Sequence, residues 1–177
     1  MKKLIYSGLI ALSLSPLPAL ASVSGYIKMG GSYMSQADGS SFDQSRMMID
    51  LGTGSVTDKG WTLGLNYNYE KDSGGENKTG SSSSPTRSSI GPTVGWISKR
   101  EMGPYFLLSY YLFSSRSDGY TGSGYQFDGG YKVPIGFTSI ALQLTYKRFS
   151  YGKLNGASVG AFNQTYVDPY IVCWIDF

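Results

Sequence analysis

Histidine is absent from this sequence of 177 residues, and cysteine occurs once, at position 173. Without histidine there is no imidazole base to activate a serine nucleophile, and no cluster of His and Cys side chains can bind zinc. A single cysteine cannot form an internal disulfide, so Cys173 is interpreted as a small apolar side chain. No dinucleotide-binding glycine fingerprint, P-loop or closely spaced glycosidase carboxylates occur. The sequence therefore predicts a protein that is not an enzyme and that needs no metal or cofactor.

The first 21 residues have the parts of a secretory signal peptide. A basic start at Lys2-Lys3 precedes a mostly apolar stretch over residues 4–14, and residues 19–21 offer a cleavage site of small side chains. The apolar stretch falls short of the roughly 20 residues that a membrane-spanning helix needs. We predict a signal peptide over residues 1–21 and a single domain over residues 22–177.

The charge that remains after this cleavage is low and balanced. Loss of Lys2 and Lys3 reduces 15 basic residues to 13, against 12 acidic ones, which leaves a net charge of +1. Nucleic acids attract proteins with a strong excess of positive charge. The composition therefore gives no reason to expect a nucleic-acid partner.

Apolar residues recur at every second position, and no stretch of residues 22–177 repeats them at the 3.6-residue spacing of a helix. Clusters of Gly and Ser divide the alternation into eight expected strands. The expected apolar face consists of Val23, Ile27, Met29 and Tyr33; Met47, Ile49 and Leu51; Trp61, Leu63, Leu65, Tyr67 and Tyr69; Ile90, Val94 and Trp96; Phe106, Leu108, Tyr110 and Leu112; Tyr125, Phe127, Tyr131 and Val133; Ile140, Leu142, Leu144 and Tyr146; and Val167, Ile171, Cys173 and Ile175.

The connections between these expected strands alternate in length. Short connections are expected at Val56–Gly60, Ser98–Gly103 and Val133–Phe137, and longer ones near Gln36–Phe42, Asp72–Arg87, Ser115–Gly122 and Gly152–Asn163. Aromatic residues gather at both ends of the strands, with Trp61, Trp96, Tyr131 and Phe177 near the short turns and Tyr33, Tyr67, Tyr69, Tyr110, Tyr125 and Tyr146 near the long loops. Two aromatic bands and two kinds of connection are typical of barrels that cross a membrane.

The last expected strand, residues 168–177, carries the clearest resemblance to a known group of proteins. It alternates through Ile171, Cys173 and Ile175 and ends in Phe177. Together with the strand pattern, this resembles the small outer-membrane barrels of the OmpA, OmpX and OmpW kind, although no motif selects one member family. The resemblance implies an all-β, eight-stranded antiparallel up-and-down transmembrane β-barrel in the outer membrane of a Gram-negative bacterium. It also implies a monomer that contacts outer-membrane lipid and is recognised by the barrel-assembly machinery through the C-terminal strand, with Phe177 as the assembly signal.

Charged side chains fall on the face opposite the apolar one. A Lys or Arg that faces lipid at mid-depth costs about 2–4 kcal/mol, which explains why charges are confined to the interior. Because the interior of an eight-stranded barrel is just wide enough for side chains to fill it, we expect these charges to form ion pairs that plug the lumen. An ion pathway is the alternative, but a selective pore normally shows a ring of one sign. The expected interior charges are Lys28, Arg46, Asp50, Glu70, Asp128, Lys132, Lys147, Asp168 and Asp176.

Two of the expected strands are apolar on both faces. Tyr105, Leu107, Tyr111 and Phe113 are expected to point inward from one, and Tyr166, Tyr170, Val172 and Trp174 from the other. They could fill the periplasmic half of the interior. They could instead line a pocket or side exit for an apolar molecule, which the OmpW-like resemblance suggests and which would involve Tyr105, Leu107, Tyr111, Tyr170, Val172 and Trp174.

These patterns predict a barrel with a largely plugged interior and a structural or surface-interaction role through its external loops. A narrow channel or carrier for small hydrophobic molecules is one alternative, and a soluble exported barrel that binds a ligand is another. Two prolines, Pro92 and Pro169, fall within expected strands. Since proline interrupts a hydrogen-bonded ladder, we expect a bulge or a strand end at each.

Overall fold

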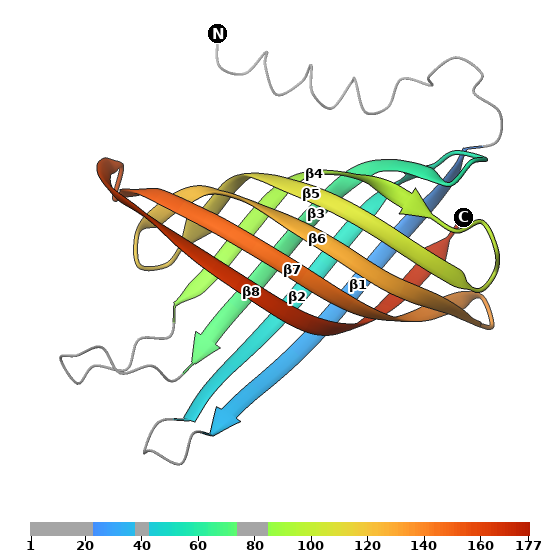
Figure 1. Ribbon diagram of the computed structural model, residues 1–177, viewed down its shortest axis with the longest axis horizontal. Helices are drawn as coiled ribbons and strands as arrows, with labels where there is room; N and C mark the ends of the chain where they lie inside the picture. The colour runs from blue at the N-terminus through green and yellow to red at the C-terminus, as the bar shows by residue number, and fades with distance from the viewer. Residues whose placement is uncertain (1–22, 38–42, 74–84) are drawn as a thin grey trace, which may run out of the picture.

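A computed structural model describes residues 23–37, 43–73 and 85–177, so the predicted signal peptide lies outside the described residues. The eight antiparallel strands form a closed barrel in which each strand pairs with the next and β8 pairs with β1 (Figure 1). This confirms the predicted fold. The strands are β1 (Ser24–Ala37), β2 (Asp43–Val56), β3 (Trp61–Ser73), β4 (Thr86–Ile97), β5 (Gly103–Arg116), β6 (Tyr120–Ile135), β7 (Thr138–Leu154) and β8 (Ala157–Asp176). The described residues include no helix long and apolar enough to cross a membrane.

The two ends of the barrel differ in their connections. One end, which we call the terminal end, holds Ser24, Phe177 and the short connections 57–60, 98–102 and 136–137. The opposite end, which we call the loop end, holds the other four connections between strands. At the loop end the structure corrects two predictions. The expected long loops at Ser115–Gly122 and Gly152–Asn163 are turns of three and two residues, 117–119 and 155–156, on strands that continue further than expected. Gly, Ser and Thr there were interpreted as loop formers, but a backbone ladder needs no apolar side chains to continue.

The predicted alternation between the two faces holds along almost the whole barrel wall. Outward side chains such as Leu63, Leu142 and Ile171 are 65–73% exposed and form a continuous apolar surface. One prediction is wrong, because Phe113 is 73% exposed and points outward. The pairing of β5 with β6 shifts register between Tyr111 and Ser114. An extra residue at this β-bulge reverses the alternation, so Ser114 takes the inward place.

The expected irregularity is present at Pro92, whereas β8 neither bulges nor ends at Pro169. Pro92 pairs with Leu65 of β3, but the ladder from β4 to β5 shifts register around it. Pro169 pairs with Leu144 of β7, while the ladder from β8 to β1 has already ended at Ile171. Neither proline therefore lies in a ladder that is regular on both sides.

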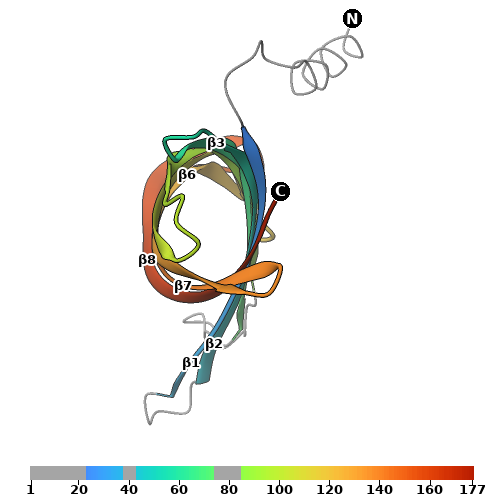
Figure 2. The ribbon, with the colours of Figure 1, turned by 90° about the vertical axis from the view of Figure 1, so that its right-hand side faces the viewer.

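The seam between β1 and β8 is short. Residues Tyr26–Gly31 pair with Ile171–Asp176, and the backbones of Gly25 and Phe177 exchange hydrogen bonds of 2.5 and 3.0 Å beside them. The ring of Phe177 covers Gly25, where any Cβ atom would collide with it. Towards the loop end, β1 and β2 lead away from β8, as the two ribbon views show (Figures 1 and 2).

Candidate functional site

The interior of the barrel is built in three layers, of which the first, the apolar layer, lies towards the terminal end. It centres on Trp174, whose ring lies 5.1 Å from that of Tyr26 and 4.8 Å from that of Tyr105, measured between centroids. Two glycines on neighbouring strands make room for Tyr26, since a Cβ atom at Gly54 or Gly64 would lie 2.9 Å from it. The layer is therefore a packed cluster of rings rather than an open space.

The second layer, the central layer, is polar and holds one cation between two carboxylates. The Nζ atom of Lys28 lies 2.6 Å from Asp50 and 2.8 Å from Asp128, and all three side chains are at most 1% exposed. The amides of Asn66 and Gln126 donate to these carboxylates at 2.8 and 2.9 Å. Lys28 of β1 pairs with Asp50 on the neighbouring strand β2, whereas its pair with Asp128 of β6 crosses the lumen.

Uncharged groups complete the central layer. Tyr111 donates its hydroxyl proton to Gln126 at 2.7 Å and accepts a hydrogen bond from Asn66 at 2.9 Å. Thr145 donates to Asp128 at 2.9 Å, and Gln143 in turn donates to Thr145 at 2.7 Å. The buried carboxylates thus have neutral donors as well as a cation, as burial of charge requires.

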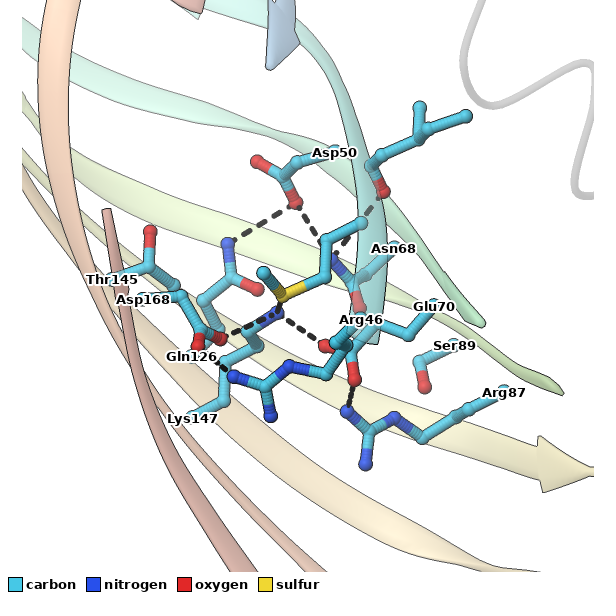
Figure 3. Close-up of polar contacts among 12 residues, drawn as sticks. Arg46, Asp50, Asn68, Glu70, Arg87, Ser89, Gln126, Thr145, Lys147 and Asp168 are labelled. Carbon is cyan, nitrogen blue, oxygen red and sulfur yellow. Dashed lines mark hydrogen bonds and ion pairs between the residues drawn. The ribbon is translucent and has the colours of Figure 1, made fainter. Parts of the chain in front are cut away.

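The third layer, the loop-end layer, is a chain of alternating charges (Figure 3). Lys147 pairs with Glu70 and lies 3.4 Å from Asp168, and its Nζ atom donates to the hydroxyl of Tyr170 at 2.7 Å. Each of these carboxylates also pairs with an arginine, Asp168 with Arg46 and Glu70 with Arg87. Five charges from β2, β3, β4, β7 and β8 are therefore joined across the lumen.

The sequence analysis missed Arg87 and Arg116. Arg87 was assigned to a loop but is buried on β4, where its guanidinium lies 3.9 Å over the ring of Phe149. Arg116 ends β5 and shares the side-chain oxygen of Gln164 with Arg87, at 2.8 and 3.4 Å. The alternation of β4 could have revealed Arg87, because it lies two residues before the inward-facing Ser89 and therefore points to the same side.

The structure separates the predicted apolar pocket into two groups. Five of its side chains pack in one buried cluster, whereas Tyr111 packs with Phe149 and Tyr151 in a second. All six predicted pocket side chains are at most 2% exposed. The members of the first group are Tyr105, Leu107, Tyr170, Val172 and Trp174.

Lys132 and Asp176, which the sequence placed in the interior network, lie apart from the other charges at the mouth of the terminal end. They pair at 2.6 Å, and the carboxylate of Asp176 is 45% exposed. A cavity of about 430 Å³ opens beside them, lined by the turns at residues 97–101 and 134–139. This pair is therefore in contact with solvent, unlike the central layer.

Comparison with known proteins bears on the fold. No protein-family model and no curated protein matches the chain. Among solved structures, it is similar to the outer membrane protein Ail of Yersinia pestis, with 14% identity, a TM-score of 0.50, and coverage of 88% of this chain and 100% of that one. The fold is that of an eight-stranded outer-membrane β-barrel. Neisserial surface protein A is also similar, with 13% identity, a TM-score of 0.49, and coverage of 88% and 96%.

Proposed function

We propose that this protein is an integral outer-membrane barrel whose interior is closed by its own side chains, and that it acts structurally or by surface interaction at the loop end. The observation that carries the proposal is the arrangement of charge, which is buried and paired inside a wall that is apolar outside. No catalytic role is assigned to any residue.

The outer surface supports a location in a membrane. Side chains such as Leu63, Leu142 and Ile171 would expose a large apolar surface to water in a soluble protein. In lipid, the same surface is favourable, and the backbone groups of neighbouring strands pair with each other along the wall, apart from the loop-end part of the β1–β8 seam. The signal peptide predicted from the sequence and the likeness in fold to outer-membrane proteins agree with this location.

The central layer supports a closed interior. Asp50 and Asp128 are fully buried around Lys28, so neither carboxylate is exposed to solvent. Positive and negative side chains are in direct contact here, whereas a selective ion filter would be lined by charges of a single sign.

Two long hairpins support surface interaction. β5–β6 and β7–β8 continue beyond the outward apolar residues and end in the turns at 117–119 and 155–156. Residues 157–161 of β8 are exposed, small and uncharged. Such a surface is available for contact with another molecule outside the membrane.

A carrier for small hydrophobic molecules remains the second candidate. The observation in its favour is the short β1–β8 seam, because no backbone ladder joins β1 to β8 towards the loop end.

Fractionation and conductance test the two halves of the proposal. The mature protein should fractionate with outer membranes and run with heat-modifiable mobility on a gel, and recovery in a carbonate-soluble fraction would exclude the membrane location. Planar-bilayer recordings should show little or rare conductance. Steady, resolvable channels would exclude the closed interior and favour the carrier.

A further inference from the structure

The wall of the barrel is incomplete on one side. The β1–β8 ladder ends at Gly31 and Ile171, and beyond this point, within the described residues, β1 pairs only with β2 and β8 only with β7. Val167 and Pro169 lie in the part of β8 that is not paired with β1. Both residues still point outward with the apolar surface. Unpaired backbone groups are costly next to lipid, so something must hold this part of the seam together.

The sequence itself specifies where the ladder ends. On β1 the last two paired residues are Gly30 and Gly31, and on β8 Pro169 follows two residues beyond the last pair. Two adjacent glycines give the strand unusual backbone freedom, and proline has no N–H to donate to a ladder. Gly30 also lies under Tyr170, whose ring would be 3.3 Å from a Cβ atom there.

One side chain spans the unpaired region. Arg46 of β2 is opposite Met34 of β1, and its Nη2 atom lies 3.8 Å from the Met34 sulfur. The guanidinium then pairs with Asp168 of β8 and lies 4.3 Å over the ring of Tyr166. The side chain of Arg46 is 17% exposed, whereas Asp168 is fully buried. An ion pair thus joins β2 to β8 across β1, where no backbone ladder joins β1 to β8.

We propose that Arg46 and Asp168 form a latch that closes the loop-end half of the β1–β8 seam. Release of this ion pair lets the loop-end part of the β1–β2 hairpin move further from β8, with β1 bending at Gly30 and Gly31, which opens the interior sideways. The inference rests on the proposed membrane location, because only there does the opening lead to the outer leaflet. If the protein is a carrier, this opening gives a small hydrophobic molecule a route that avoids the central layer.

Distance measurements between spin labels test the latch in lipid nanodiscs. Labels at Tyr33→Cys and Val167→Cys, in a Cys173→Ser background, report on the two sides of the unpaired seam from outward positions. The expected result is a longer and broader distance distribution in Arg46→Ala and in Asp168→Asn than in the parent. Arg46→Lys, which keeps the cation, should stay close to the parent.

Two controls separate the latch from general loosening. Labels at Leu142→Cys and Ile171→Cys span a paired position of the β7–β8 ladder and should not move in any variant. Lys132→Ala removes an ion pair at the terminal end and should leave the Tyr33–Val167 distance unchanged.

The outcomes that overturn the latch are specific. An unchanged Tyr33–Val167 distance in Arg46→Ala excludes it, and so does an equal change in Lys132→Ala or at the Leu142–Ile171 pair. A parent protein that does not insert into nanodiscs contradicts the proposed location instead, so the two failures are distinguishable.

Discussion

The apolar layer and the loop-end layer differ both in their side chains and in the wall around them. Around the apolar layer, β1 and β8 are paired, and Trp174 packs against Tyr26 and Tyr105. Around the loop-end layer the seam is unpaired, and a chain of ion pairs that includes Arg46 and Asp168 crosses the lumen. Of these two layers, the one inside the paired part of the seam is apolar and the one inside the unpaired part is charged.

This difference indicates a division of roles. Apolar packing is non-directional and holds the strands in place only if the wall is already closed. Ion pairs with hydrogen-bond geometry join particular strands, and they can be broken one at a time. Between the two lies the central layer, whose Lys28 is shielded on both sides.

The largest effect is expected at the central layer. Lys28→Met leaves Asp50 and Asp128 buried without their cation, and loss of one partner of a buried ion pair costs about 3–5 kcal/mol. Urea unfolding in bilayers should show a loss at the upper end of this range, or no refolding. Asp50→Asn should cost less, because Lys28 keeps Asp128. Equal losses in the two variants would show that Lys28 does not hold the layer together.

A similar or slightly smaller loss is expected in the apolar layer. Trp174→Ala removes a fully buried ring and should reduce the free energy of unfolding by about 3–5 kcal/mol. Conductance in planar bilayers should nevertheless stay low, because the central layer still closes the lumen. Steady channels in this variant would mean that the apolar layer alone is the barrier.

The outer wall should tolerate charge less well than the ends of the strands do. Leu142→Arg places a guanidinium at mid-depth in lipid and should cost about 2–4 kcal/mol, measured by the same unfolding experiment. Ser150→Arg lies on the same outward face of β7 nearer the loop end and should cost less than about 1 kcal/mol. If Ser150→Arg were the more damaging of the two, the assigned membrane depth of β7 would be wrong.

The smallest effect is expected where the loop-end layer meets solvent. Arg116 pairs with Asp118 at 2.7 Å, but the Asp118 carboxylate is 38% exposed. Exposed ion pairs contribute about 0–1 kcal/mol, so Arg116→Ala should barely change the free energy of unfolding. A loss of unfolding free energy as large as that of Lys28→Met would contradict the distinction between the buried central layer and the solvent-exposed loop end.

Side-chain direction was the most predictable property of this chain. Alternation placed Lys28, Asp50 and Asp128 inside and Leu142 outside, because a strand has a period of two and lipid excludes charge. The rule failed at Phe113, since a bulge adds a residue and reverses the parity, and no residue type marks that position.

The pairing of the charges was less predictable than their direction. Whether Asp168 meets Arg46 depends on how the strands are staggered around the barrel. This stagger cannot be predicted from the sequence of one strand alone. Arg87 was missed for a different reason, because the Ser-rich segment before it suggested a loop. Pro169 was a visible signal for the end of the β1–β8 ladder, but Gly30-Gly31 could be recognised as its counterpart only once the register between β1 and β8 was known.

The length of β8 gives the protein reach. With 20 residues at about 3.3 Å each, the strand extends about 65 Å, or about 45 Å in height at a tilt of about 45°. The apolar band of such barrels is about 25 Å tall, so in the proposed location about 20 Å of the height of β8 lies outside this band. If the loop end is external, as proposed, this extra length takes the turn at 155–156 out past the apolar band and into the headgroup region or beyond.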